Sequence, residues 1–512
     1  MNKAKKKVIS LIAFGLILLT IFIIPLLINK TLVFIRVDEG SIFTTIKIIT
    51  NTGNYFSELP FFDGLTNYAA PGLHLNIATL FLISLSSFKL VEMEILFYLF
   101  IVFSLIVGAI FVYKIALEIL NNRIFAFFSS ILTLILPFIN YKLFYLHADL
   151  YDNFVSIILI WACMLYIYKY LKTENTKNLG ISIIFLSAAA LIHLYIAFIS
   201  LILLSLIILL NKKNCINKKI KILGILSLCS FIVISGYLIV APILQKLLAV
   251  FNITQNKFSE AYSPHLINWD DFLNLITPIG FILIILLAFY FVLNKENQSI
   301  REKIFPINLF CTILILFIIL FKFSLTNLVG LKMDLLLILG LPFIISLTIT
   351  KNKINILNKS MSLLLIFILV ITFIINSVNI LNGFSLDEIN SVSTALNSNG
   401  CKITASQFRI SSWVPFLSNS IVYYASADPF FSHSDKLDDV SKMLSSKFLN
   451  QSQRYDFAKE KKVDCFIYMK NSLIVDGYGF KGTAKNNYET LEDKNKFEVG
   501  YEDTNTILIK IK

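Results

Sequence analysis

Two groups of acidic side chains stand next to long apolar runs, where they could act on a substrate at a membrane surface. Asp38 and Glu39 lie in FIRVDEGSIF, directly after the first apolar run, and Asp149 and Asp152 lie in HADLYDNF, directly before another. A carboxylate held there can act as a general base toward an incoming hydroxyl group, and a second can orient the acceptor or bind a cation. A single loop acid is more often only solvated, but two such clusters favour a shared site.

A phosphate group leaving from a lipid would need a cation near the same surface. Arg36 lies two residues before Asp38, and Lys332 lies in NLVGLKMDLLLILGLPF, at the boundary of a late apolar run. Both are candidates for binding the phosphate of a donor. For Lys332 the competing interpretation is a side chain that snorkels from a helix end, with Asp334 as its partner.

Three further side chains are candidates to line the substrate site: Tyr68 in NYAAPGLHL, His147 beside Asp149, and His193 in AALIHLYIAF. The competing interpretation of His193 is a hydrogen-bonded histidine in a helix turn. His147 next to Asp149 leaves open the binding of a divalent cation. A single His beside a single acid is weak evidence for a metal site, however, and favours a site without metal. The sequence assigns no cofactor with certainty.

The composition indicates which elements must position these residues. Of the 512 residues, 57% are hydrophobic and only 15% are charged, which is far from the balance of soluble domains. We therefore expect a polytopic α-helical membrane protein. The net charge of +13 comes largely from lysines in short loops between apolar runs, where positive charge sets the orientation in the membrane. Nucleic-acid binding is therefore not expected.

Loop charges and helix lengths predict the topology. The lysine-rich loops 211–219, 294–303 and 351–359 are expected in the cytoplasm, as is the basic N-terminus. As a single helix the apolar run 180–210 would be roughly 46 Å long, against a hydrocarbon core of about 30 Å. We therefore predict two helices that turn near His193 on the outer side. The other apolar runs after the first helix lie at 72–88, 93–117, 123–139, 154–170, 222–244, 272–294, 304–321, 334–350 and 360–381.

A parity argument then assigns one apolar run to the membrane interface. The loops that carry the two acid clusters both face outward, so an even number of spans must separate them, yet three apolar runs lie between. The weakest of these, 72–88, contains polar residues and is predicted to be interfacial. This choice leaves Lys114 and Arg123 in the cytoplasm and gives about eleven spans in total.

The composition changes after residue 382 and predicts two domains. Residues 1–382 form the transmembrane domain, and residues 383–512 a small extracytoplasmic α/β domain. In the latter, CKITAS, IVYYAS and VDCFIYM are predicted strands, and KFEVGYEDTNTILIKIK is a predicted hairpin. It has no glycine-rich phosphate loop, so no catalytic role is assigned to it. The outer loops of the transmembrane domain are predicted at 30–92, 140–153 and 245–271.

The six cysteines show no metal-binding spacing. Cys163, Cys229 and Cys311 lie inside apolar runs and are expected to be small hydrophobic filler. Only Cys401 and Cys465 could meet in an extracytoplasmic domain, which leaves a disulfide there open.

The order of these motifs resembles a known family. A first helix, then DEG, then a loop with TGNY and finally NYAAPGLHL is similar to the first outer loop of GT-C fold glycosyltransferases of the protein mannosyltransferase and aminoarabinose transferase type. LYDNFVSIILIWA resembles their second acid and the helix that follows, which singles out Asp152 over Asp149. The chain departs from the family at APGLHL, where some relatives have Pro-Pro-Leu, and at Lys332, where an arginine is frequent.

The resemblance implies an inverting glycosyltransferase of the cell membrane. It would transfer a hexosyl or pentosyl group from a polyprenyl-phosphate-linked donor to a glycan, lipid or protein acceptor at the extracytoplasmic face. Asp38 would be the base, with Glu39 as the alternate, and Asp152 with or without Asp149 would position donor or acceptor. In oligosaccharyltransferase subunits of the same fold, the two acid clusters hold a divalent cation.

Two other function classes fit a chain with many spans and few charges. A transporter or lipid flippase usually places ionisable residues near the bilayer midplane and shows repeated halves, whereas the acids here gather at one predicted face. A polysaccharide polymerase or ligase shares the lipid-linked donor, but usually relies on Arg and His in a large outer loop, and this chain has few arginines.

Overall fold

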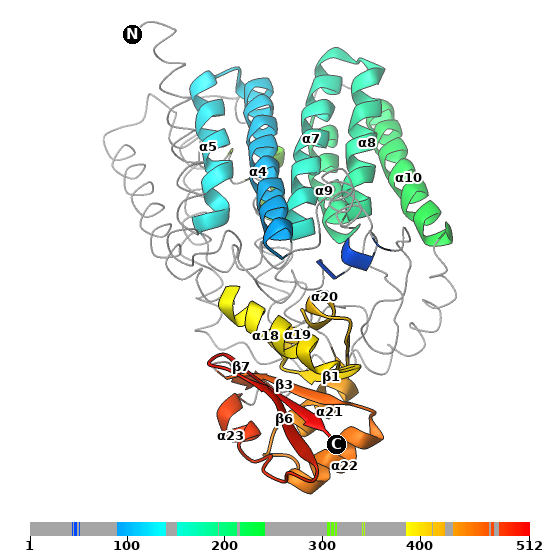
Figure 1. Ribbon diagram of the computed structural model, residues 1–512. Coiled ribbons are helices and arrows are strands. Elements are labelled where there is room, and N and C mark those ends of the chain that lie inside the picture. The colour runs from blue at the N-terminus through cyan, green and yellow to red at the C-terminus, as the bar shows by residue number, and fades with distance from the viewer. Residues whose placement is uncertain are drawn as a thin grey trace, which may run out of the picture. The chain divides into compact units, whose positions relative to one another are not determined.

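The chain divides into two compact units, one of residues 1–24, 98–244 and 262–381 and one of residues 25–97, 245–261 and 382–512. Figure 1 shows the computed structural model. It describes residues 43–44, 46–48, 51, 90–139, 151–192, 194–211, 216–240, 305–307, 309–311, 313–314, 340, 343, 386–411, 413–424, 434–470, 473–475 and 481–512. Each unit is considered by itself.

Apolar helices make up the described part of the first unit. Among the residues whose side chains are described, one helical stretch, Val155–Thr173, is long and apolar enough to cross a membrane. Large apolar side chains point outward from these helices, such as Phe103 and Phe198 at 63% and 67% exposure, which suits a lipid environment. The helices are α4 (Leu90–Leu120, whose first residues belong to the second unit), α5 (Arg123–Ile139), α7 (Tyr151–Thr173), α8 (Thr176–Ile192), α9 (Leu194–Leu209) and α10 (Ile216–Val240).

At two tight connections a residue with positive φ ends one helix and an asparagine caps the next. Between α4 and α5, Asn121 adopts a positive φ of 51°, and the side chain of Asn122 accepts a hydrogen bond from the Phe125 backbone N–H at 3.2 Å. Between α7 and α8, Glu174 has a φ of 58°, and Asn175 accepts from the backbone N–H of Lys177. Asn is favoured at such N-caps because its short side chain satisfies a free N–H of the first turn.

Two ion pairs bring these connections to one end of the helices. Lys172 Nζ lies 3.1 Å from Glu118 Oε2 near the end of α4, and Lys218 Nζ at the start of α10 lies 2.7 Å from Glu174 Oε2. Figure 1 shows the α4–α5 and α7–α8 connections together at the top. The sequence predicts that all of these segments face the cytoplasm, and a common end is what that prediction requires.

The end of α9 returns to the same place, because Lys219 donates a hydrogen bond to the backbone oxygen of Leu209 at 2.7 Å. Since α8 begins at this end and α9 finishes there, the chain reverses direction between Thr176 and Leu209. The predicted division of the apolar run 180–210 into two helices is confirmed. The division follows from the mismatch between the length of that run and the thickness of a bilayer.

The α4 helix meets α7 at a glycine. A Cβ atom placed on Gly108 would lie 3.2 Å from both Ile158 Cγ1 and Trp161 Cζ3, so only a residue without a side chain fits there easily. Trp161 is fully buried at this contact. On the other side of α7, Tyr166 stacks on Phe185 of α8 with 5.8 Å between ring centroids.

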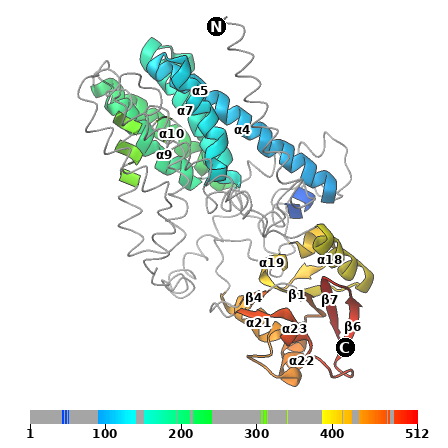
Figure 2. The same cartoon turned by 90° about the vertical axis from the view of Figure 1, so that its left-hand side faces the viewer.

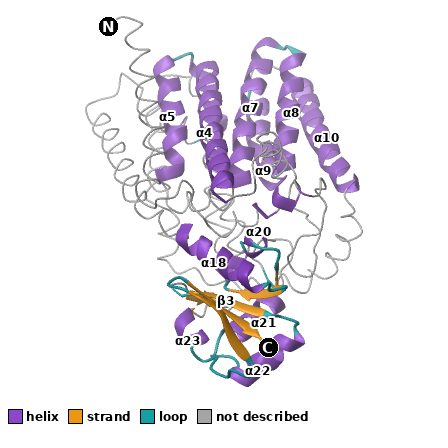
Figure 3. Ribbon diagram, in the orientation of Figure 1, coloured by secondary structure: helices purple, strands orange, loops and turns teal. Residues whose placement is uncertain are grey.

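A mixed sheet forms the centre of the described part of the second unit. Its strand order is β2-β1-β3-β7-β6, in which β2, β1 and β3 are parallel and β7 and β6 complete the sheet as an antiparallel pair. Figure 3 shows these strands in orange. The strands are β1 (Ile403–Ser406), β2 (Ile421–Val422), β3 (Cys465–Met469), β6 (Phe497–Glu502) and β7 (Thr506–Ile511), and a separate pair is β4 (Leu473–Val475) with β5 (Lys481–Thr483).

Helices cover both faces of this sheet. Ala405, Phe466 and Ile509 alternate with their strand neighbours and share one core with Met443 and Ala458 of the covering helices. Figures 1 and 2 show α18 on the opposite face from α21 and α22. The helices of this unit are α18 (Leu386–Asn399), α19 (Phe408–Ser411), α20 (Val414–Leu417), α21 (Ser434–Leu444), α22 (Gln451–Glu460) and α23 (Ala484–Tyr488).

A disulfide joins Cys401 to Cys465, with 6.0 Å between the Cα atoms. It ties the residue that leads into β1 to the first residue of β3. The two strands are hydrogen-bonded neighbours, with Thr404 opposite Cys465. The sequence left this pairing open, because spacing alone does not show which cysteines come within reach of one another.

Candidate functional site

Most residues that the sequence nominates for chemistry lie outside the described residues, and their roles remain predictions. Only Asp152, the second residue of α7, lies within the described ranges; its backbone is described while its side chain is not, and its role is a prediction as well. The nominated residues outside the described ranges are Arg36, Asp38, Glu39, Tyr68, His147, Asp149, His193 and Lys332. The interfacial assignment of 72–88 also falls outside these ranges.

A buried hydrogen bond aligns the start of α7 with the end of α8. The Ser156 hydroxyl donates to the backbone oxygen of Ala189 at 3.2 Å, and Ser156 is fully buried. Asp152 precedes Ser156 by one helical turn, and α8 ends at Ile192, about one turn beyond Ala189. Because the two helices run antiparallel, the backbone of Asp152 and the last turn of α8 lie at a common level. This level is opposite to the end marked by Glu174.

The first predicted outer loop contributes a short helical segment to the second unit. Residues 43–44 and 46–48 are helical, and Phe43 is 1% exposed. The ring of Phe43 lies 5.5 Å from that of Trp413, edge to face, and 5.6 Å from that of Phe416. Trp413 and Phe416 contact each other as well, so three rings from two distant parts of the chain form one cluster.

Lys47 reaches from the same segment to the end of α20. Its ammonium donates hydrogen bonds to the backbone oxygens of Phe416 at 2.9 Å, Pro415 at 3.3 Å and Ser418 at 3.5 Å. Partial burial lowers the pKa of the Lys47 ammonium from its ordinary value. The last carbonyl groups of a helix have no partner inside it and carry partial negative charge, which suits a cation.

The remaining carbonyl group at this end is bonded to α18. The backbone oxygen of Leu417 accepts from Asn397 Nδ2 at 3.0 Å and from the Ser393 hydroxyl at 3.5 Å. Thus α20 is fixed from two directions, by Lys47 of the first loop and by the polar face of α18. We call the cluster of Phe43, Lys47, Trp413 and Phe416 the loop anchor.

Sequence reasoning did not find the loop anchor. The run SIFTTIKIITNTGNYF is amphipathic, which indicates that one side of it packs against something. Nothing local to it points to Trp413 or Phe416, because a contact between residues this far apart leaves no periodic signal.

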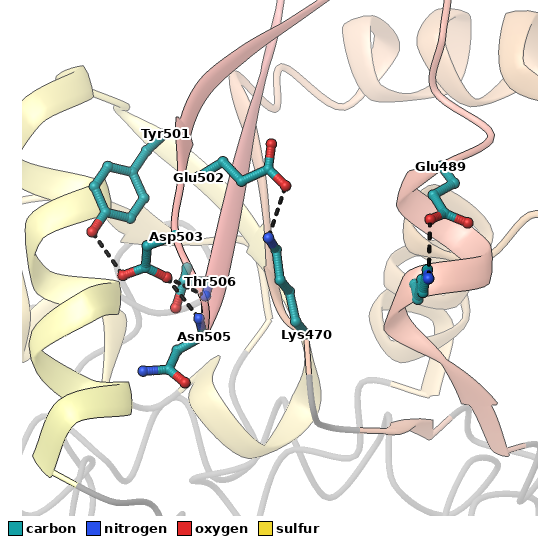
Figure 4. A network of polar contacts seen from close by, with 8 residues as sticks. Lys470, Glu489, Tyr501, Glu502, Asp503, Asn505 and Thr506 are labelled. Carbon is teal, nitrogen blue, oxygen red and sulfur yellow. Dashed lines mark hydrogen bonds and ion pairs between the residues drawn. The ribbon is translucent and has the colours of Figure 1, made fainter.

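A second polar network closes the β6–β7 hairpin (Figure 4). Asp503 accepts hydrogen bonds from the backbone N–H groups of Thr506 at 2.7 Å and Asn505 at 2.8 Å, and from the Tyr501 hydroxyl at 2.8 Å. Partial burial pushes the pKa of Asp503 upward, but the hydrogen bonds outweigh it and hold this pKa below its ordinary value. The bond to Asp503 raises the pKa of Tyr501. These contacts stabilise a turn and create no site.

In the part of the chain that the structure describes, no three His, Cys, Asp or Glu residues gather where a metal ion could bind. The acids that the resemblance implies as ligands, Asp38 and Asp152, are not among the side chains described.

No family model matches the sequence, and no protein in a search of curated proteins matches it either. Solved structures do match. ArnT from Cupriavidus metallidurans, an aminoarabinose transferase, superimposes with a TM-score of 0.62 over 99% of this chain and 98% of that chain, at 10% identity. The Archaeoglobus fulgidus oligosaccharyltransferase gives a TM-score of 0.57 over 88% and 69%, at 11% identity. Both are GT-C fold enzymes. The chain has the GT-C fold.

A third match, the mycobacterial arabinofuranosyltransferase AftD, has a TM-score of 0.57 at 11% identity and covers 98% of this chain but 41% of that one. The GT-C fold confirms the predicted family resemblance at the level of architecture, and with it a polytopic membrane protein. ArnT has also been solved bound to undecaprenyl phosphate. The archaeal oligosaccharyltransferase has been solved with Zn and sulfate, and tethered to an acceptor peptide containing the NVT sequon.

Proposed function

We propose that this protein is an integral membrane glycosyltransferase that transfers a sugar from a polyprenyl-phosphate-linked donor to an acceptor at the extracytoplasmic face of the cell membrane. The observation that carries the proposal is the GT-C fold over almost the whole length of both this chain and ArnT, a transferase whose structure holds undecaprenyl phosphate. The acceptor is a glycan, a lipid or a protein, and the sugar a hexose or a pentose.

The proposed chemistry is a single displacement with inversion. Asp38 accepts the proton of the acceptor hydroxyl as its oxygen attacks the anomeric carbon, with Glu39 as the alternate base. The bond between that carbon and the phosphate oxygen breaks through an oxocarbenium-like state, and polyprenyl phosphate leaves. Arg36 and Lys332 offset the charge that develops on the leaving phosphate.

Asp152 with Asp149 positions donor or acceptor in this scheme, and Tyr68, His147 and His193 line the site. The alignment of Asp152 with the last turn of α8 supports this placement, because residue 193 directly follows that turn. A divalent cation between the acid clusters would orient the acceptor, and its ligands would come from the same acids.

The proposed orientation puts the N-terminus and the lysine-rich connections in the cytoplasm, with about eleven spans. The disulfide between Cys401 and Cys465 supports an extracytoplasmic position for the C-terminal domain, because disulfides persist in oxidising compartments. The acid-bearing loops then share that side of the membrane.

Release of the lipid carrier tests the proposal. The purified full chain would be incubated with polyprenyl-phosphate-linked mannose or arabinose as hexose and pentose probes, with a membrane lipid extract as acceptor. We expect free polyprenyl phosphate from at least one probe. Asp38→Asn should slow its release by roughly 100- to 10,000-fold, the usual contribution of a general base.

Asp63→Asn is the matched control, because Asp63 is another acid of the same predicted loop. It should retain the wild-type rate. Intact probes after incubation with the wild-type chain would argue against glycosyl transfer and for a transporter. A fully active Asp38→Asn variant would remove Asp38 as the base.

A further inference from the structure

We propose that the C-terminal domain positions the catalytic loop, and that Lys47 is the positioning residue through which it does so. The proposal rests on the proposed function in one respect, because it takes Asp38 as the base. It assigns to residues 383–512 a role that the sequence did not, namely holding a loop of the transmembrane domain in a defined place.

The contacts of Lys47 are those of a fixed side chain. An ammonium group has three protons to donate, and three backbone oxygens of residues 415, 416 and 418 surround it. The same ammonium lies 5.8 Å from the ring centroid of Phe416. A lysine that only snorkelled would keep its head group in water, whereas this one is directed at carbonyl groups of the protein.

The partner of Lys47 is itself rigidly held. Leu417 is bonded to Asn397 and Ser393 of α18, and α18 covers one face of the sheet. The Ser418 hydroxyl bonds back to the Val414 oxygen at 2.8 Å, which closes the short α20 helix. A displacement of Lys47 relative to the domain would therefore break its hydrogen bonds to residues 415, 416 and 418.

The anchor lies close to the proposed base along the chain. Phe43 follows Asp38 by five residues, and a fully extended chain of that length spans at most roughly 18 Å. Fixing Phe43 and Lys47 therefore sets an upper limit on how far Asp38 can lie from the loop anchor, and reduces the number of conformations open to the loop. The rate depends on where the base lies relative to the hydroxyl proton, because a misplacement of about 1 Å can lower the rate roughly 100-fold.

The test uses the full chain and the release of polyprenyl phosphate from the same linked sugars. Lys47→Met keeps the length of the side chain but removes its three donors, and Lys47→Arg restores donors for the carbonyl oxygens. Lys494→Met is the matched control, because Lys494 is an exposed lysine of the same unit. Integrity of each variant is checked by size exclusion and by the presence of the Cys401–Cys465 disulfide.

We expect Lys47→Met to lower kcat by about 10- to 100-fold, with KM for the donor changed by less than about threefold, since Lys47 binds no substrate. Lys47→Arg should recover most of the lost kcat. Combining Lys47→Met with Asp38→Asn should give no loss beyond that of Asp38→Asn alone, because Lys47 acts only by positioning that base. A purely structural residue would lower the fraction of folded protein without this pattern.

Two outcomes separate the claims. If Asp38→Asn is inactive while Lys47→Met keeps the wild-type kcat, the positioning role is wrong and the proposed function stands. If Asp38→Asn is fully active, the proposed base is wrong whatever Lys47 does. Phe43→Leu provides a second route should Lys47→Met fail to fold, because it loosens the ring contacts with Trp413 and Phe416 and should lower kcat in the same way.

Discussion

Lys218 at the start of α10 forms an ion pair with Glu174 in the α7–α8 connection, with 2.7 Å between Nζ and Oε2. Together with the pair of Lys172 and Glu118, it places three helix connections at one end of the first unit. Surface ion pairs contribute little to stability, so these two matter here for the positions of the connections that they join. They show which loops share a side.

Cysteine accessibility would test that arrangement in the membrane. In intact cells an impermeant thiol reagent should label Tyr145→Cys, because residue 145 lies in the predicted second outer loop. Leu80→Cys should be labelled from the same side, since 72–88 is predicted to be interfacial. Asn175→Cys, at the exposed α7–α8 connection, is the control that should react only after the cells are opened. Labelling of residue 145 from the cytoplasm alone would refute the parity argument.

Gly108→Ala should loosen the contact between α4 and α7. The added Cβ would lie 3.2 Å from side-chain atoms of Ile158 and Trp161, so these side chains must give way by a few tenths of an ångström, at a cost of about 1–3 kcal/mol. A lower thermal unfolding midpoint of the purified chain would show it. Gly180→Ala is the matched control, because no atom lies within 4 Å of its added Cβ, and it should be neutral or slightly stabilising. Equal midpoints for the two variants would contradict the tight contact.

The sequence predicted the helices of the first unit well where a local pattern, such as the length of an apolar run, was enough. The α5 helix spans 123–139 as expected, and the length of the run 180–210 was enough to predict α8 and α9. The contact of Phe43 with Trp413 could not be predicted, because it depends on how remote segments fold back on one another. The acid clusters were chosen for residue type and position, and neither property gives the distance between Asp38 and Asp152.

Arg454→Met should destabilise the C-terminal domain strongly. Arg454 is completely buried and donates to the backbone oxygens of Met443 at 2.7 Å and Leu444 at 3.2 Å, and to the Tyr468 hydroxyl at 2.7 Å. Met would leave these acceptors without their donor, at a cost of about 3 kcal/mol or more. Pulse proteolysis across a urea series would measure the loss, with the exposed Asp456→Asn on the same helix as control. An unchanged urea midpoint would mean that water replaces the guanidinium.

Asp503→Asn should remove a pH-dependent part of the stability of the hairpin. The pKa of Asp503 is lower in the folded chain than its ordinary value of about 3.9, so its ionised form stabilises the fold. That contribution is present above the ordinary pKa and is lost as the pH falls through the folded value. The free energy of unfolding should therefore differ between wild type and variant by about 1 kcal/mol at neutral pH, and by less in acid.

Urea unfolding of both proteins between pH 7 and pH 3 would measure this difference. Glu498→Gln on β6, the strand that ends directly before Asp503, serves as the control, because its side chain is exposed. A difference that stays constant over this range would show that the carboxylate charge plays no part.

The contact between Lys47 and Phe416 joins residues that lie 369 positions apart. A ribosome that adds roughly 5–20 residues per second needs about 20 to 70 seconds to make that stretch. During this time the first loop has left the ribosome, but the surface on which it docks has not yet been synthesised. The loop can therefore dock only after the C-terminal domain has been made, and a chain stalled before residue 416 would leave its first loop unanchored.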